Sequence, residues 1–427
     1  MLRGTGGGPH TTPNPKKSAQ QVSGGMDAAA EDTRKAPVKG LRGFLRSRAR
    51  DIAVAALLTL ACGWLAQRVA PPEGSPLSRA AAPYSSRPAA SRRVASRVPV
   101  LAPPADEQPA LGGARNRSRL PDVADRRAGA VLGSFTADAA AMGLHWIYDT
   151  TRLAKMVDGR PPEFHKPPAC PFYKYESGEQ SPYGDEELLL LQAVVEGKGV
   201  DGAAIQQALY RGFKAYGGRL NSASTKLVQA VDRGCAYPDC APQDDQAHGL
   251  VKVAVVAARY AGSPLLVAKM EEAVRAHQSH PLSISTAVDA AKLLEHVILH
   301  GSVSGAIEWG LQAGHLSDSG RRFLSNAHRS RHSQHTAAVR KFGQTCHLPG
   351  SFESMLHGAL SSTSYEEAVR RTILAGGDNC SRATLLGALF GAEGGAAAIP
   401  ESWRSQVRRY TQLSGLVQQL VVDAASS

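Results

Sequence analysis

The sequence from residue 127 to residue 421 predicts one all-α domain, a single bundle of many helices. Apolar residues recur there at three- and four-residue spacing, which is the pattern of one buried helix face. Runs of alternating or β-branched residues are rare, so few or no strands are expected. About 300 residues without an internal repeat fit one large domain better than two.

The residues before this domain have a different composition. They are rich in Gly, Pro, Ser, Ala and Arg and poor in aromatic residues, which is typical of chains that cannot build a core. We interpret residues 1–51 as a disordered basic tail, residues 52–70 as an apolar segment and residues 71–126 as a disordered linker. The apolar run follows four arginines but is short for the hydrocarbon core of a bilayer. A membrane anchor and organelle targeting are the leading options for it, an unaddressed extension is a third, and the compartment stays unassigned.

Charge separates the two parts of the chain. Residues 1–127 hold 21 Lys and Arg against 9 Asp and Glu, a net charge of +12, whereas the remainder holds 28 of each sign. The basic character therefore belongs to the N-terminal part. Nucleic-acid binding by the folded domain has no electrostatic support.

Six cysteines are scattered along the chain, without a Cys-x-x-Cys pair or a Cys/His cluster at zinc spacing. The sequence therefore predicts neither a disulfide framework nor a zinc site. Cys235 and Cys240 are close enough in sequence to pair in an oxidising compartment, but two free thiols are the favoured reading.

The first predicted helix of the domain carries small residues at a spacing of four, at Gly129, Gly133 and Ala137. Such a stripe lets another backbone approach closely. Asp138 follows inside the same apolar stretch, and a buried carboxylate must be paired, hydrogen-bonded or bound to a ligand. His145 and Trp146 come next, and on their own packing and hydrogen bonding are favoured over ligand contact for them.

A second candidate is the segment Ser181-Pro-Tyr-Gly-Asp-Glu, which starts a helix whose apolar part runs over Leu188–Val195. Asp185 and Glu186 are adjacent carboxylates beside a glycine turn. Acidic residues in a first helical turn are also favoured by the helix dipole alone, so a structural role stays open. Two further helices are predicted over Leu265–Val274 and Ser285–His300 from their apolar stripes.

The third candidate lies between two helices near the C-terminus. Ser364 and Glu367 form a capping box at the start of the first helix. Gly376 and Gly377 end it, as a left-handed cap requires. Asp378 then begins a helix in which glycines recur every four residues, at Gly387, Gly391 and Gly395. This corner is a candidate site, although an Asp in this place is also an ordinary N-cap.

Together these pieces resemble the ADP-ribosylglycohydrolase superfamily, and most closely its J-type crystallin branch. The resemblance covers about Arg127 to Val421. It rests on HWIYD, SPYGD, the stretch DDQAHGLVKVAVVAARYAG, the block PGSFESMLHGALSSTSYEEAVRRTILAGGDNCSRA and the terminal IPESW. The resemblance implies an orthogonally packed multi-helix bundle with a pocket at converging loops.

The resemblance also implies a metal site. Catalytic members hold two Mg²⁺ ions through an early Thr-Asp-Asp and a late Asp-x-Asp-Thr. These motifs fall on Gly184, Asp185 and Glu186, and on Asp378, Cys380 and Ser381 of this chain. The expected ligands of one or two Mg²⁺ ions are therefore Asp185, Glu186, Asp378 and Ser381. Occupancy is in doubt because Gly184 has no side-chain oxygen and Cys380 offers sulfur to a hard cation.

For an enzyme of this kind, the resemblance assigns the general base to Asp185 or Glu186, acting on a water that attacks the ribose anomeric carbon. Further residues are expected near the ligand or behind the metal ligands: Asp138, Tyr183, His145, Trp146, Asn379 and Cys380.

Two functions are compatible with these residues. The first is a protein that binds an ADP-ribose-type ligand and hydrolyses an ADP-ribosyl linkage with Mg²⁺, its partner being the small molecule or an ADP-ribosylated protein. The alternative is a non-catalytic, crystallin-like structural or binding protein with a degraded metal site. A membrane partner is expected only through residues 52–70, and a thiol-dependent site at Cys380 is a weaker third idea.

Overall fold

The computed structural model describes residues 121–426, and these residues form an all-α fold. No β-strand occurs among them. Two isolated bridges, Ile147 with Gly377 and Gln246 with His347, are the extended pairings in this part of the chain. The prediction of an all-α domain is confirmed.

The described residues form sixteen α-helices and two short 3₁₀ helices. In chain order these are α2 (Val123–Met142), α3 (Thr150–Val157), α4 (Pro182–Glu196), α5 (Gly202–Lys214), α6 (Ser222–Asp232), η1 (Ala247–Lys252), α7 (Val253–Tyr260), α8 (Leu266–Arg275), α9 (Pro281–His300), α10 (Val303–Leu311), α11 (Asp318–Arg329), α12 (His335–Phe342), α13 (Gly350–Ser361), α14 (Tyr365–Leu374), α15 (Asn379–Gly394), η2 (Ala396–Ala398), α16 (Glu401–Arg404) and α17 (Tyr410–Ala425).

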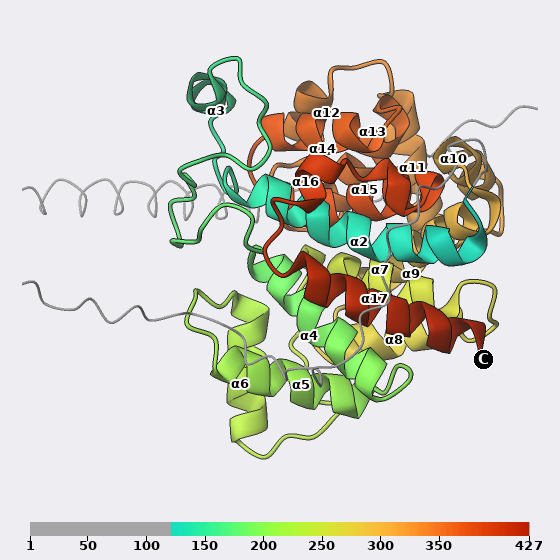
Figure 1. Ribbon diagram of the computed structural model, residues 1–427. Helices are drawn as coiled ribbons and strands as arrows, with labels where there is room; N and C mark the ends of the chain where they lie inside the picture. The colour runs from blue at the N-terminus through green and yellow to red at the C-terminus, as the bar shows by residue number, and fades with distance from the viewer. Residues whose placement is uncertain (1–120, 427) are drawn as a thin grey trace, which may run out of the picture. The chain divides into compact units, whose positions relative to one another are not determined.

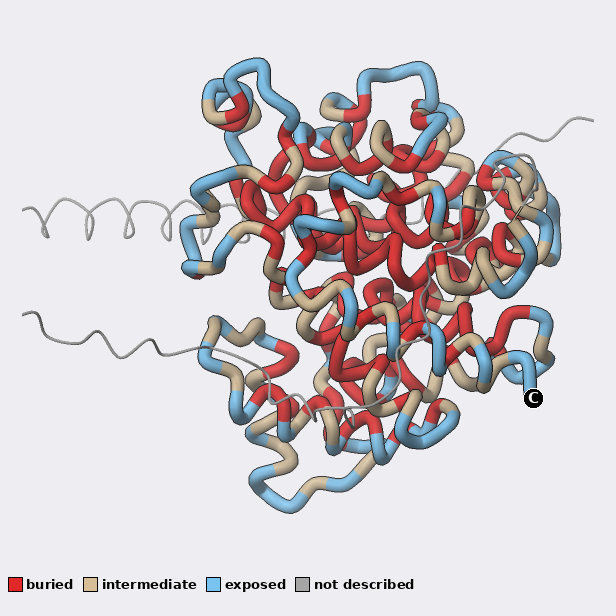
Figure 2. Tube along the Cα trace, in the orientation of Figure 1, coloured by how far each residue is buried: buried red, intermediate tan, exposed pale blue. Residues whose placement is uncertain are grey.

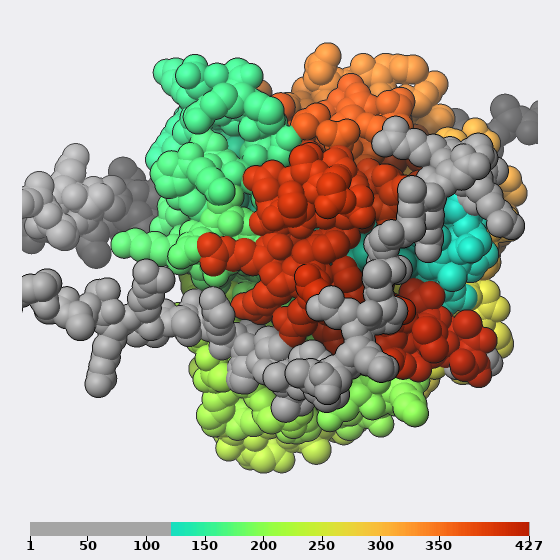
Figure 3. All heavy atoms as spheres, in the orientation of Figure 1, coloured from blue at the N-terminus to red at the C-terminus, as the bar shows by residue number. Residues whose placement is uncertain are grey.

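Helices α2 and α15 lie side by side in the middle of the bundle (Figure 1). Helices α12, α13 and α14 lie on one side of this pair, and α4, α7 and α9 lie on the other (Figure 1). The buried residues follow the central helices, whereas exposed residues are concentrated in the outer loops and in α3, α5 and α6 (Figure 2). The C-terminal segment, in red, lies on the surface between the orange residues above it and the green residues below it (Figure 3).

The two predicted stripes of small residues pack against each other. A Cβ built on Gly387 would lie closer than 3.0 Å to the Gly133 carbonyl oxygen and to the Ala137 methyl group, and one on Gly391 would meet the Gly129 carbonyl in the same way. The backbones of α2 and α15 therefore touch directly, which only glycine permits. Both helices are buried along most of their length, as expected for central helices that are apolar all round.

Several helix boundaries differ from the sequence expectation. Helix α2 begins at Val123, because the Asp122 side chain accepts a 2.8 Å hydrogen bond from the Asp125 amide, so the last residues of the predicted linker are helical. Helix α9 begins at Pro281, ahead of the predicted Ser285, since proline suits the first helical position. Gly395 ends α15 at a φ of 66° instead of continuing its stripe.

The predicted capping box of α14 is half formed. The Ser364 hydroxyl accepts from the Glu367 amide at 3.2 Å, as expected. The Glu367 carboxylate, however, accepts from the amide of Thr363 at 2.7 Å and from its hydroxyl at 2.8 Å, one residue before the predicted donor. Gly376 and Gly377 adopt left-handed φ values of 70° and 66°, so the predicted glycine cap is confirmed.

The predicted tail and apolar segment, residues 1–70, lie outside the described residues, as does most of the linker. Within residues 121–426, no helix combines the length and the apolar composition needed to cross a bilayer.

Alanine at Gly387 tests the contact between the central helices. We expect Gly387→Ala to lower the free energy of unfolding by about 2 kcal/mol or more, because the added methyl must push two backbones apart. The matched control is Gly415→Ala on the surface of α17, where a Cβ meets nothing within 4 Å. That change should stabilise by roughly 0.5–1 kcal/mol through helix propensity. Urea unfolding measures both, and equal effects at the two positions would contradict the proposed contact.

Candidate functional site

The corner before α15 is fixed by backbone hydrogen bonds to the segment after α2. The Trp146 amide donates to the Gly377 carbonyl at 2.9 Å, and the Gly377 amide donates to the Ile147 carbonyl at 2.8 Å. Trp146 itself has a left-handed backbone with a φ of 59°, a conformation that costs a non-glycine residue about 1–2 kcal/mol. The strained residue and the glycine corner therefore hold each other in place.

The Asp378 carboxylate is held by side chains from both segments. The Trp146 indole nitrogen donates to Asp378 Oδ1 at 2.8 Å, and the Ser381 hydroxyl donates to Oδ2. His145 Nε2 lies 3.4 Å from Oδ1. The Asp378 side chain makes no capping hydrogen bond to the helix amides, so the simple N-cap interpretation does not apply.

His145 is held in turn by Asn379. The Asn379 amide nitrogen donates to the Leu144 carbonyl at 3.1 Å, which leaves its oxygen to accept from His145 Nδ1 at 2.9 Å. Burial lowers the pKa of His145 to about 4, so the ring is neutral near pH 7. The structure thus brings five predicted residues together around one carboxylate: His145, Trp146, Asp378, Asn379 and Ser381.

Asp138 is buried beside this group and accepts from Ser181. The Ser181 amide donates to Asp138 Oδ2 at 2.7 Å and the Ser181 hydroxyl donates to Oδ1 at 2.5 Å. Cys380 Sγ lies 3.8 Å from the Asp138 carbonyl oxygen. Burial raises the pKa of Asp138 to about 6.

Gly184 lies directly against Asp138. A Cβ at this position would come closer than 3.0 Å to Asp138 Oδ2 and to the Gln180 side chain. A threonine at this position would therefore require the Asp138 and Gln180 side chains to move. With glycine here, the first position of the early motif supplies no side-chain oxygen.

Asp185 has a separate set of partners. The Tyr216 hydroxyl donates to Asp185 Oδ2 at 3.1 Å, and the Tyr216 and Tyr175 hydroxyls are themselves in contact. Burial raises the pKa of Asp185 to about 7. The cavity that Asp185 lines, together with Arg219, has a volume of only about 10 Å³, room for roughly one water molecule.

Glu186 belongs to a buried ion cluster. Its carboxylate contacts Lys252 Nζ, His248 Nδ1 at 2.8 Å and His277 Nδ1 at 3.0 Å. Burial alone would raise the pKa of Glu186, but His277, Lys252 and His248 together hold it well below its usual range. These ligand-type atoms of Glu186, His248 and His277 lie within 4.8 Å of one another, a spacing that could hold a metal ion.

Tyr183 lies between the Asp378 group and the Glu186 group. Its ring centroid is 5.9 Å from that of His145 and 5.2 Å from that of His248. Burial and the nearby Asp378 raise the pKa of Tyr183 well above its usual value, so the phenol stays protonated. Within residues 121–426, no hydrogen bond or ion pair directly joins Asp185, Glu186 and Asp378.

Sequence reasoning missed His248, Lys252 and His277. His248 and Lys252 lie four residues apart in the apolar stretch that carries the resemblance, and this spacing on one helical face was the available signal. His277 follows α8 and is 91 residues from Glu186, so no local pattern points to it.

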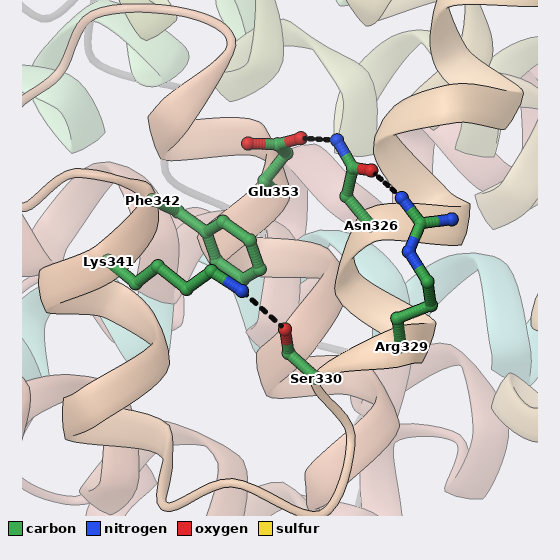
Figure 4. Close-up of a pocket in the computed structure, with 6 residues that line it drawn as sticks. All are labelled: Asn326, Arg329, Ser330, Lys341, Phe342 and Glu353. Atoms are coloured by element: carbon green, nitrogen blue, oxygen red, sulfur yellow. Dashed lines mark hydrogen bonds between the residues drawn. The ribbon is translucent and has the colours of Figure 1, made fainter.

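A larger cavity, of about 320 Å³, contains none of the predicted residues. It lies among α11, α12 and α13, where Asn326 donates to Glu353 at 2.6 Å and Lys341 donates to Ser330 at 3.4 Å (Figure 4).

Comparison with known proteins identifies relatives of this chain. The sequence model of ADP-ribosylglycohydrolase matches residues 119–426. The chain belongs to the ADP-ribosylglycohydrolase family. It is 33% identical over 313 residues to Crystallin J1A of Tripedalia cystophora, covering 69% of this chain and 96% of the crystallin. Crystallin J1B of the same organism is 30% identical over 316 residues, covering 70% of this chain and 97% of that protein.

A solved structure described as an ADP-ribosylglycohydrolase-related protein complex has the same fold, with a TM-score of 0.57 and 18% identity, covering 71% of this chain and 99% of the other. The family, its crystallin-like branch and its fold are therefore as the sequence predicted.

The residues present do not fit the two-ion Mg²⁺ arrangement of the catalytic ADP-ribosylglycohydrolases. Mg²⁺ requires near-octahedral oxygen ligation. Both Asp378 oxygens and both Glu186 oxygens already accept from protein donors. Position 184 offers no side-chain oxygen, and Cys380 Sγ faces a backbone carbonyl. A divalent ion bound by Glu186 would have to displace the Lys252 ammonium from that carboxylate.

The raised pKa of Asp185 predicts a pH-dependent stability. Between the ordinary aspartate pKa near 4 and the folded value of about 7, the native state keeps a proton that the unfolded chain has lost. The stability that this proton supplies is therefore lost as pH rises through that window. In Asp185→Asn the loss is absent, and Tyr216 can still bond to the amide.

The measured quantity is the free energy of unfolding of Asp185→Asn minus that of the parent protein. We expect this difference to rise by roughly 2 kcal/mol between near pH 5 and near pH 8. Urea unfolding at the two pH values measures it. The exposed Asp239→Asn serves as the control and should show a pH-independent difference. A pH-independent difference for Asp185→Asn as well would contradict the assigned burial.

Proposed function

We propose that this chain is a non-hydrolytic, crystallin-like member of the ADP-ribosylglycohydrolase family. The observation that carries the proposal is Gly184, which offers no side-chain oxygen at the first position of the early metal motif and lies directly against the Asp138 carboxylate. The engagement of Asp378 and Glu186 by protein donors supports it further. Under this proposal the helical bundle serves a structural or binding role, in keeping with the crystallin names of its relatives.

The catalytic roles assigned to Asp185 and Glu186 by resemblance are the rival proposal. Asp185, with a pKa raised to about 7, has the acidity of a general base or acid. Glu186 lacks that property, because it is bound to a lysine and two imidazoles and its pKa is held low. A hydrolytic reaction would therefore depend on Asp185, in a cavity that has room for about one water molecule.

Hydrolysis is tested with the full chain, Mg²⁺ and ADP-ribosylated substrates. We expect no release of ADP-ribose above the blank from Arg-, Ser- or Asn-linked protein, and none from O-acetyl-ADP-ribose, because the cation ligands are already engaged. An active Mg²⁺-dependent family enzyme, assayed in parallel, is the positive control. Mg²⁺-dependent release that disappears in both Asp185→Asn and Asp378→Asn would overturn the proposal.

Binding without hydrolysis is a second candidate, favoured by an aromatic group beside the Asp185 cavity. Phe172 is 48% exposed, and its ring packs edge-on against Trp146 at 5.2 Å. The Arg219 guanidinium lies 4.7 Å from the centre of the Phe172 ring and also lines the cavity. An exposed ring beside a guanidinium suits a planar base and an attached phosphate, the chemistry of an ADP-ribose-type ligand.

Calorimetric titration with ADP-ribose tests this binding. If Arg219 pairs with the phosphates, Arg219→Ala should weaken affinity about tenfold or more, equivalent to roughly 1.5–3 kcal/mol for a charged hydrogen bond. The exposed Arg233→Ala is the matched control and should leave affinity unchanged. Affinity that falls equally in both variants, or no heat of binding in the parent protein, would exclude the assigned surface.

A further inference from the structure

Four buried side chains form one cluster: Glu186, His248, Lys252 and His277. All four side chains are at most 2% exposed. They come from three separate elements: α4 supplies Glu186, η1 supplies His248 and Lys252, and the turn after α8 supplies His277. The cluster is therefore assembled by the tertiary fold.

The cluster contains the donor set of a metal site. One carboxylate oxygen of Glu186 and one ring nitrogen of each histidine lie within 4.8 Å of one another. Two imidazoles and one carboxylate are a ligand set that binds Zn²⁺ and related divalent ions. The outer nitrogen of His277 lies 3.1 Å from the Ser224 hydroxyl, a support of the kind that orients metal-binding histidines.

A cation of the chain itself already lies against this set. Lys252 Nζ contacts Glu186 Oε1 and lies 3.4 Å from His277 Nδ1. It also donates to the His248 carbonyl oxygen at 3.1 Å. The ammonium thus has two oxygen acceptors, Glu186 Oε1 and the His248 carbonyl, and lies near the His277 ring, which donates to the same carboxylate.

Burial makes an isolated charge at Glu186 costly. An isolated carboxylate in a protein interior is strongly unfavourable, and removing one partner from a buried ion pair leaves the other charge uncompensated. Hydrogen bonds from the His248 and His277 rings lower that cost. The Lys252 ammonium, in contact with Glu186 Oε1, supplies the compensating positive charge.

We propose that the Lys252 ammonium takes the place of a divalent metal ion in the Glu186–His248–His277 cluster. This inference rests on the proposed function and deepens it, because it names the group that supplies positive charge at Glu186, the last carboxylate of the early motif. Lys252, His248 and His277 lie outside the two metal motifs, and the inference is tested without an activity assay.

The test replaces Lys252 with methionine, which has a similar length and no charge. The parent protein and Glu186→Gln are dialysed against Zn²⁺ or Co²⁺ and then freed of loosely bound ions. Elemental analysis should find no more metal in the parent protein than in Glu186→Gln. Lys252→Met without metal should melt on the order of 10 °C lower than the parent. Added Co²⁺ should restore part of the loss and give about one bound equivalent, with the visible absorption of a nitrogen- and oxygen-ligated site.

Two controls keep the result interpretable. The double variant Glu186→Gln/Lys252→Met removes both charges, so it should melt higher than Lys252→Met and bind no Co²⁺. Lys269→Met removes a partly exposed lysine from its pair with Glu272, and should change the melting temperature little. If Lys252→Met does not fold, the metal content of the parent and of Glu186→Gln still decides whether this site holds an ion.

The proposal is overturned if the parent protein holds one equivalent of metal that Glu186→Gln loses. It is also overturned if Lys252→Met melts with the parent and binds no Co²⁺. Neither outcome depends on ADP-ribose release, so a hydrolytic activity found in the assay above would refute the proposed function while leaving this inference standing or falling on its own measurement.

Discussion

Direct backbone contact between α2 and α15 determines where the candidate residues lie. The carbonyl groups of Gly133 and Gly387 lie too close to the opposite helix for a side chain at either of these two positions. Because the two helices cannot separate, Asp138 near the end of α2 lies beside Cys380 in the first turn of α15. Tyr365 adds to this arrangement, since its hydroxyl donates to the Gly133 carbonyl at 2.7 Å. The position of the Asp378 corner relative to the segment after α2 thus follows from a contact between glycines.

Much of this architecture could be predicted from sequence because its signals are local. The stripes at Gly129 and Gly133 and at Gly387 and Gly391 indicated close helix packing, and the structure pairs them with each other. The glycine pair before Asp378 indicated a left-handed turn, which is present. Where boundaries differ, as at Val123 and Pro281, a single capping residue or proline moved the helix start by a few positions.

The partners of the acidic residues could not be predicted in the same way. Helical periodicity does not show which distant residues face Glu186. Lys252 and His277 are 66 and 91 residues away, and only the closed bundle brings them to the carboxylate. Asp185 and Glu186 are adjacent in the chain, yet their side chains enter different environments, one facing Tyr216 and the other facing Lys252. The sequence alone presents Asp185 and Glu186 together, as two adjacent carboxylates of one site.

The interior lysine also changes how this fold depends on its surroundings. A bound ion obeys a dissociation constant, so the occupied fraction of molecules falls when the free ion becomes scarce or is captured by a stronger chelator. Lys252 is synthesised with the chain and contacts Glu186 in a fixed one-to-one ratio. The charge balance at this carboxylate is consequently the same in every copy of the protein, whatever the mineral content of its environment.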